Sequence, residues 1–234
     1  LHFLDTANGH DMHRGREFMG RLVRSDLGIS SGEVVLGNIA TPQGIKSFNY
    51  LMQPKGVTPQ DTRFTTPMIP SIWRVGIGCG GACLTTVNTG IGMPTLQSVM
   101  DCSTAKGTML IADGGMKTPG DVCKALRLGA SFAMLGSYFS GCVGTDSTFY
   151  GEASALAKGH KKYIEGDEIP VTMTQDTIQD RVQRLKDGIA SMLSYVGMSS
   201  VDELSADKTP TESRFVQVTQ AGRNDWQSHA RGRL

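Results

Sequence analysis

Short apolar runs recur along the chain, and each is followed by polar residues or glycine and then by a segment with helical spacing of apolar positions. These runs predict strands at Leu1–Leu4, Glu33–Leu36, Ile72–Val75, Thr108–Ala112 and Phe132–Leu135. Helices are predicted from Phe18 to Leu27, after Pro42, near Pro94 and from Pro119 to Leu128. Strands that alternate with helices in this way are typical of a parallel α/β architecture.

The residues that follow the predicted strands carry polar groups or lack a side chain. They are Asp5, Asn38, the loop that begins at Gly76, Asp113 and Gly136. Parallel strands bring their carboxyl ends to one edge of the sheet, and in a TIM-type barrel that edge carries the active site. We therefore predict an α/β fold of the parallel β/α (TIM-type) barrel class, with its functional residues at this edge.

The chain shows about five of the eight β/α units of such a barrel. A complete barrel usually needs about 250 residues, whereas this chain has 234 and begins inside a strand without an initiator Met. We expect either a barrel truncated at its N-terminus or an incomplete barrel. Residues 1–204 are predicted to form the barrel domain, with a flap at about 142–168, and residues 205–234 a C-terminal tail. Residues 54–70 are predicted to be irregular, and 176–195 a long amphipathic helix.

Composition narrows the classes of partner. Lys and Arg total 23 against 22 Asp and Glu, so the net charge of +1 gives no basic surface for nucleic acid. The apolar runs are far shorter than the ~20 residues that cross a bilayer, and no signal-peptide pattern opens the chain, so we expect a cytoplasmic protein without a membrane partner. The five cysteines include no C-x-x-C pair, and the five histidines are scattered, which fits neither a disulfide framework nor a transition-metal site.

The segment from Gly76 to Thr86 is the strongest candidate for chemistry. A predicted strand leads into a glycine-rich loop whose carbonyls and amides can bind an ion or a phosphate, and the loop ends in the Cys83 thiol with two threonine hydroxyls close by. A free cysteine is usually an inert small hydrophobe. The loop, the threonines and the Asp113-Gly114-Gly115 turn after the next predicted strand favour a reactive nucleophile instead.

Several motifs together resemble a known family. They are the run from Val75 to Pro94, Asp113-Gly114-Gly115, Pro119-Gly120-Asp121-Val122, Met134-Leu135-Gly136 and Phe149-Tyr150-Gly151. In this set, and in the spacing from Cys83 to Thr89-Gly90, the chain resembles the catalytic barrel of the IMP dehydrogenase/GMP reductase family from Asp5 to about Gln220. Ala7-Asn8-Gly9, Ser194-Tyr195-Val196-Gly197, the short flap without arginine from Ala153 to Asp167, and Glu168-Ile169-Pro170 are similar to the reductases of the family.

The resemblance implies NADPH-dependent reductive deamination of GMP to IMP and ammonia. Cys83 would attack C2 of the purine and form a covalent thioimidate, while Thr85 and Glu168 relay a proton to the departing amine. It also implies ligand contacts: Asp113 with the ribose; Gly115, Gly136 and Ser137 with the phosphate; Gly151, Glu152 and Ser154 with the base; Asp5, Asn38 and Arg74 on the cofactor side; and carbonyls of Gly78, Gly80 and Cys83 with a potassium ion. The family also implies a homotetramer. It further implies that the molecule bound is a purine mononucleotide.

Some positions depart from the family pattern. Gly81 stands where the family has a phosphate-binding Ser, Cys79 replaces a Pro, Arg74 replaces a Lys, and Glu152 replaces the Met of Gly-Met-Ser-Ser. Glu152 either points to solvent while the backbone binds the base, or its carboxylate accepts from N1–H and the 2-amino group of guanine. Asp5 and Asn38 have helix capping as an alternative role, and Glu168 an ordinary place on the surface.

Two other functions stay open on the sequence. One is IMP dehydrogenase activity, which oxidises IMP to XMP with NAD. The other is purine-nucleotide binding without catalysis, which would follow if the missing front of the barrel leaves the cofactor site incomplete. The chain shows no segment typical of a clamp for the 2′-phosphate of NADPH, so the choice between NADPH and NADH also stays open.

Overall fold

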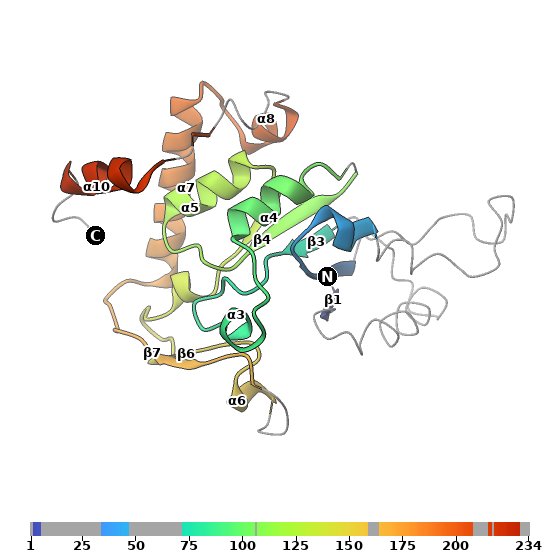
Figure 1. The fold of residues 1–234 in the computed structure, drawn as a ribbon. Helices are drawn as coiled ribbons and strands as arrows, with labels where there is room; N and C mark the ends of the chain where they lie inside the picture. Colours follow the sequence, from blue (N-terminus) through green and yellow to red (C-terminus); the bar gives the residue numbers. More distant parts are fainter. Residues whose placement is uncertain are drawn as a thin grey trace, which may run out of the picture.

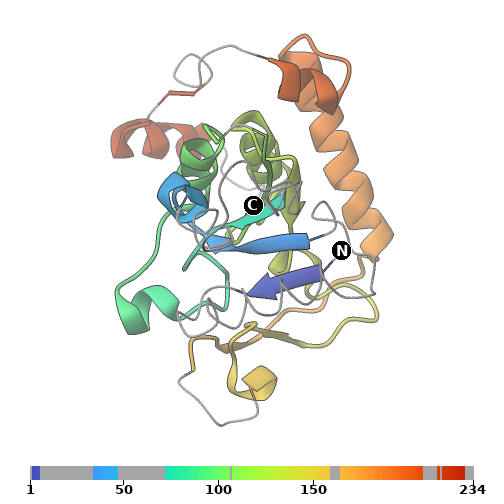
Figure 2. The same ribbon diagram turned by 90° about the vertical axis from the view of Figure 1, so that its right-hand side faces the viewer.

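The computed structural model describes residues 2–5, 34–46, 72–105, 107–158, 164–207, 215–216 and 218–229, and its centre is a parallel sheet. The strands are β1 (His2–Asp5), β2 (Val34–Ile39), β3 (Ile72–Val75), β4 (Met109–Asp113) and β5 (Phe132–Met134). They pair in chain order, each parallel to the next, as Figures 1 and 2 show. An order without reversal is that of a TIM-type barrel, since a doubly wound sheet reverses direction at its first strand.

The five predicted strands are confirmed, with ends that differ by at most a few residues. Within the described residues they form one open sheet, which corresponds to five of the eight strands that a TIM-type barrel contains. The predicted helix from Phe18 to Leu27 and the predicted irregular segment 54–70 lie outside the described residues.

The helices follow the strands as predicted. A helical segment at 42–46 follows β2, α4 (Thr95–Cys102) lies between β3 and β4, and α5 (Pro119–Arg127) lies between β4 and β5. The long predicted helix is α7 (Ile178–Tyr195), which packs beside α5 (Figure 1). Both α5 and α7 begin with a capping box, Thr118 with Asp121 and Thr177 with Asp180, in which side chain and backbone satisfy each other's hydrogen bonds.

The main core lies between the sheet and these helices. Trp73 and Leu110 project from β3 and β4 and are fully buried against a layer of helix side chains that includes Val99 and Ala125. Because side chains alternate along a strand, the residues next to Trp73 and Leu110 in their strands project from the opposite face of the sheet. A second, smaller cluster there contains Val35, Ile72 and Ile111.

The segment predicted as an irregular flap contains a hairpin that the sequence pattern did not indicate. Strand β6 (Thr148–Tyr150) pairs antiparallel with β7 (Glu168–Pro170), and the short helix α6 (Ala155–Lys158) lies between them in the chain. Figure 1 places this hairpin at the opposite end of the molecule from α8 (Val201–Ala206). The flap and domain boundaries themselves stay predictions.

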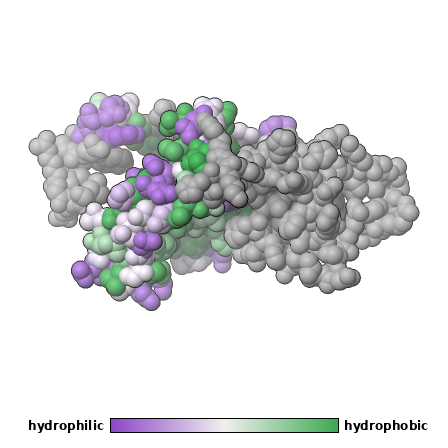
Figure 3. Space-filling model, turned by 90° about the horizontal axis from the view of Figure 1, so that it is seen from below, coloured by the Kyte–Doolittle hydropathy of each residue, from purple (hydrophilic) through white to green (hydrophobic). Residues whose placement is uncertain are grey.

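The tail holds more structure than its polar sequence indicated. Helix α10 (Gln220–His229) lies within it, and Phe215 packs against the main core. In the part of the chain that the structure describes, no helix combines the length and the apolar character needed to cross a membrane. Figure 3 shows apolar and polar residues interspersed on the face seen from below.

Candidate active site

Backbone hydrogen bonds hold the loop that carries Cys83 against the residues just before β7 of the hairpin. The amide of Leu84 donates to the carbonyl of Glu165 (2.7 Å), and the amide of Asp167 donates to the carbonyl of Ala82 (2.8 Å). Cys83 and Gly166 thus face each other in an antiparallel bridge. The side chain of Asn88 adds a hydrogen bond to the carbonyl of Ile164 (2.8 Å), and the thiol and hydroxyl of the loop remain available for other contacts.

Those side chains form a chain of three polar groups. The thiol of Cys83 donates to Oγ1 of Thr85 (3.3 Å), and the Thr85 hydroxyl donates to Oε2 of Glu165 (2.8 Å). Cys83 and Thr85 are half-buried, and the short helix α3 (Thr85–Thr89) begins at the threonine. A thiol, a hydroxyl and a carboxylate in sequence can pass a proton from one end to the other.

The carboxylate that accepts from Thr85 is that of Glu165, whereas the sequence indicated Glu168 for this role. Glu168 is exposed in β7, in register with Tyr150, and its amide donates to the side chain of Asp167. The signal that was missed is the glycine after Glu165. A Cβ on Gly166 would lie 2.5 Å from the amide nitrogen of Ser154, so only glycine allows the residue after Glu165 to pack this closely on the backbone at Ser154.

A second set of polar side chains lies at the carboxyl edge of the sheet. Arg74 and Asp113 project from the same face as Ile72 and Ile111, as the alternation along β3 and β4 requires. The Nε of Arg74 donates to Oδ2 of Asp113 (2.9 Å), and Nδ2 of Asn38 donates to the same oxygen (2.8 Å). Two residues predicted on the cofactor side therefore orient the carboxylate predicted to bind the ribose.

Arg74 also reaches across to the hairpin. Its two terminal nitrogens donate to the two carboxylate oxygens of Glu152, at 3.1 and 2.6 Å. The Arg74 side chain is 17% exposed and that of Glu152 is 65% exposed. Burial alone would lower the pKa of Arg74, but the hydrogen bond that Arg74 donates to Glu152 and the charges of both carboxylates outweigh it and raise this pKa. Glu152 is thus turned toward the sheet edge and not simply toward solvent.

The residues predicted to bind the phosphate come from loops that meet near Cys83. Ser137 begins the short helix η2 (Ser137–Phe139), and a Cβ on Gly81 would lie 3.6 Å from its Oγ. Gly136 packs against Phe149 of the hairpin, and Gly115 against the carbonyl of Cys79. The glycines therefore permit three strand-end loops and the hairpin to approach one another closely.

Comparison with known proteins assigns the chain to the family that its sequence motifs resemble. The family model described as the IMP dehydrogenase/GMP reductase domain matches residues 57–229. The chain belongs to the IMP dehydrogenase/GMP reductase family.

Several relatives found within this family are GMP reductases. The chain is 32% identical to the GMP reductase of Streptococcus pyogenes serotype M4 and 31% identical to that of serotype M5, in each case over 86% of this chain and 59% of the relative. A crystal structure of a GMP reductase variant from Trypanosoma brucei, in complex with guanosine 5′-monophosphate, matches with a TM-score of 0.75 and 25% identity. That match covers 97% of this chain and 46% of the other. The chain therefore spans about half to three fifths of the length of these relatives.

Other predicted site residues have structural contacts of their own. Ser154, predicted to bind the base, is fully buried, and its hydroxyl accepts from the amide of Ala157 in α6. Asp5 ends β1 in register with Gly37. In the loop predicted to hold potassium, the carbonyl of Gly78 accepts from the Thr86 hydroxyl (3.3 Å) and that of Gly80 from the amide of Cys83 (3.1 Å). The tetramer of the family and a cytoplasmic location stay predictions for this chain.

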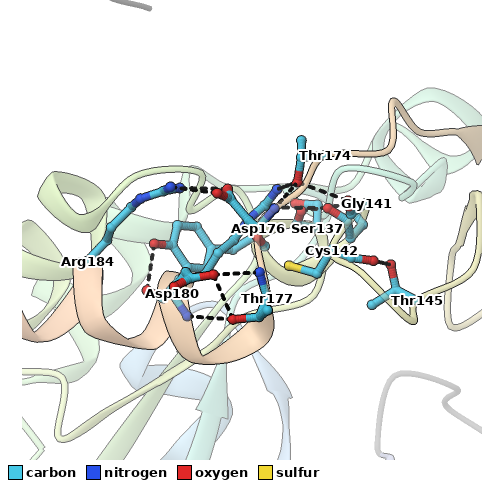
Figure 4. A network of polar contacts seen from close by, with 12 residues as sticks. Ser137, Gly141, Cys142, Thr145, Thr174, Asp176, Thr177, Asp180 and Arg184 are labelled. Atoms are coloured by element: carbon cyan, nitrogen blue, oxygen red, sulfur yellow. Dashed lines mark hydrogen bonds and ion pairs between the residues drawn. The ribbon is translucent and has the colours of Figure 1, made fainter.

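A charged cluster at the start of α7 lies outside the Cys83 region. Arg184 donates to both oxygens of Asp176 (2.7 and 2.6 Å), and Arg181 donates to Asp176 and to the carbonyls of Tyr138 and Ser140. Figure 4 shows Asp176 between Arg184 and the loop that carries Ser137. An open pocket at this corner is lined by Lys117, Thr118, Pro119, Ser137, Tyr138, Asp176, Arg181 and Arg184. Arg181 connects α7 to the loop after β5, and Arg184 connects α7 to Asp176 in the segment before it, which are structural roles.

Proposed function

We propose that the chain carries the site for reductive deamination of GMP to IMP and ammonia, with NADPH as the reductant. The observation that supports it most is the line from the Cys83 thiol through Thr85 to Glu165, because it joins a nucleophile to a proton relay. Family membership supports the reaction class, and the GMP reductase relatives support GMP as the substrate.

The residues of the relay account for the loss of the amine. Cys83, as thiolate, attacks C2 of guanine and forms a carbon–sulfur bond. The bond from C2 to the exocyclic nitrogen breaks, and Thr85 passes a proton from Glu165 to that nitrogen, so that it leaves as ammonia. A thioimidate then joins Cys83 to the purine. Glu165 takes the place in this mechanism that the sequence assigned to Glu168.

The second half of the reaction needs a hydride at C2. NADPH supplies this hydride when it is bound, and the thiolate of Cys83 leaves as IMP is released. Asn38 and Arg74, predicted on the cofactor side, already donate to Asp113, so we propose that they act chiefly by holding this carboxylate toward the ribose hydroxyls. Asp5 stays a predicted cofactor contact.

The potassium site is retained in the proposal because its donor chemistry fits. Backbone carbonyls are hard oxygen donors, and each has two lone pairs, of which the observed bonds to Gly78 and Gly80 use one. The carbonyls of Gly78, Gly80 and Cys83 would hold the ion and stiffen the loop that presents the thiol.

The test is GMP-dependent oxidation of NADPH, followed by absorbance together with ammonia release, with this chain and its Cys83→Ser variant. Turnover that is lost in the variant supports the proposal. Reduction of NAD with IMP would favour IMP dehydrogenase instead. GMP binding that protects Cys83 from alkylation, without turnover, would indicate a nucleotide-binding protein.

A further inference from the structure

The pair formed by Arg74 and Glu152 lies beside the loop of the nucleophile. Gly151 donates its amide to Asp167, and a Cβ on Gly151 would lie 2.6 Å from the carbonyl of Ala82, the residue before Cys83. Glu152 is the next residue in the chain after Gly151, so it lies beside the loop of the nucleophile. A purine that presents C2 to the thiol would lie beside the same part of the hairpin. In this position its carboxylate accepts two parallel N–H groups from Arg74.

The edge of guanine offers a carboxylate the same pattern of donors. N1–H and the 2-amino group are attached to one carbon, C2, so N1, C2 and N2 form part of a guanidine. An arginine side chain presents two N–H groups on one carbon in the same parallel arrangement. IMP keeps N1–H but has lost the 2-amino group, so it offers only one of the two donors.

We propose that Arg74 occupies Glu152 as an internal mimic of guanine, that GMP displaces it, and that Glu152 thereby selects GMP over IMP. This inference rests on the proposed function, because it places the purine of GMP against the hairpin. When GMP displaces Arg74 from Glu152, Arg74 keeps its contact with Asp113, because that contact uses Nε and not the two terminal nitrogens. Once the amine has left as ammonia, the remaining single donor competes poorly with the two of Arg74, so the pair closes again and favours release of IMP.

The experiment measures the dissociation constants of GMP and IMP by calorimetry for the full chain and for Arg74→Lys, Glu152→Gln and the double variant. Lysine is the family's residue at position 74, so the fold should tolerate it, and its single ammonium cannot fill both oxygens of Glu152. Arg127→Lys is the control, because Arg127 is buried to a similar degree as Arg74 and pairs with Asp207 beside α8, at the end of the molecule opposite the hairpin.

Arg74→Lys is expected to tighten GMP by about two- to five-fold relative to IMP, the range of an exposed ion pair. Glu152→Gln is expected to weaken GMP about tenfold and IMP much less. In the Glu152→Gln background, Arg74→Lys should leave the ratio of the two constants unchanged, and Arg127→Lys should leave both constants unchanged.

Equal changes in GMP and IMP binding in Arg74→Lys would overturn the mimic, since Arg74 would then act only through Asp113. The same holds if its effect on the ratio persists in the Glu152→Gln background. These results leave GMP binding by the wild-type chain intact and so leave the proposed function standing. Absence of GMP binding by the wild-type chain would overturn both.

Discussion

Two loops of this molecule are held by segments distant in sequence, and they differ in how far charged side chains take part. The loop around Cys83 is fixed to the hairpin by backbone hydrogen bonds, from Leu84 and from Asp167. The loop after β5 has a backbone hydrogen bond from Val143 to Asp176, and side chains add to it, since Arg181 donates to the carbonyls of Tyr138 and Ser140. In the first loop the Cys83 thiol and the Thr85 hydroxyl form the proposed relay. At the second loop the charged guanidinium of Arg181 is used to bind the carbonyls of the loop.

This difference separates a catalytic candidate from a merely polar one. The start of α7 has more charged side chains than the Cys83 loop, and a search for clustered charges alone would choose it. Its arginines, however, already bond to carbonyls and to Asp176, so they offer a ligand little. Where backbone groups provide the attachment, side chains can be spared for chemistry.

The largest expected effect belongs to the relay of the backbone-held loop. Glu165→Gln should lower kcat for GMP reduction by about 10²–10⁴-fold, the usual contribution of a general acid or base. Its melting temperature should stay near that of the wild type, because the attachment of the loop uses the backbone of Glu165 and not its carboxylate. Steady-state kinetics and thermal unfolding measure the two quantities.

Glu168→Gln is the matched control, three residues along the same chain segment, and should change kcat less than twofold because Glu168 is exposed. A larger loss in Glu168→Gln than in Glu165→Gln would return the relay to the residue that the sequence indicated.

The second effect belongs to the side-chain-held loop and concerns stability. Arg181→Met should lower the free energy of unfolding by roughly 2–4 kcal/mol, because it leaves the half-buried carbonyls of Tyr138 and Ser140 without their charged donor. Arg184→Met, whose side chain is 56% exposed, should cost under about 1 kcal/mol. Urea titrations compare the two. Equal losses would mean that the exposed pair, and not the bonds to the loop, holds this corner.

Some elements of the fold could be predicted from the sequence, and others could not. The strands and the helices α4, α5 and α7 could be predicted because apolar periodicity and capping residues are local signals. The hairpin could not, since Thr148–Tyr150 is short and its partner lies about twenty residues away, so nothing local records the pairing.

In the candidate site, too, the sequence indicated some of the residues and missed others. Cys83, Thr85 and Asp113 were marked by position after predicted strands, and the structure brings Cys83 and Thr85 together. The choice between Glu165 and Glu168 depended on the hydrogen bond from Thr85 to Glu165, which joins positions 80 residues apart and which only three-dimensional packing reveals. The contact between Arg74 and Glu152 joins positions 78 residues apart, and no pattern in a single sequence records it.

A smaller effect is expected where the two regions meet, at Gly81 and Ser137. Gly81→Ser restores the hydroxyl that the family uses for the phosphate, and the new Cβ would have ordinary contacts at 3.6 Å with Ser137 and 3.7 Å with Phe149. One added hydrogen bond should tighten GMP about fivefold. Gly81→Ala, which adds the carbon without the hydroxyl, is the control in the same binding assay. A gain in the alanine variant equal to that in the serine variant would assign the effect to a stiffer loop.

The smallest effect is a difference in acid sensitivity between the two loops. The hydrogen bond from Arg184 lowers the pKa of Asp176, and the backbone N–H of Thr177 lowers that of Asp180. A carboxyl whose pKa is lower in the folded protein stabilises the fold above its unfolded pKa of about 3.9 and loses this contribution as the pH falls through the folded value. The α7 corner should therefore loosen below about pH 4, while the attachment of the Cys83 loop, made by amides, should not.

Hydrogen exchange, corrected for the intrinsic rate at each pH, distinguishes the two loops within one sample. Val143 donates its amide to the carbonyl of Asp176, and Leu84 donates its amide to Glu165, so these two protons report on the two attachments. Acid should accelerate exchange at Val143 more than at Leu84, and Asp180→Asn should produce part of this acceleration at neutral pH. Equal acceleration at both amides would show that acid opens the barrel as one unit, and the contrast between side-chain and backbone attachment would then have no consequence for stability.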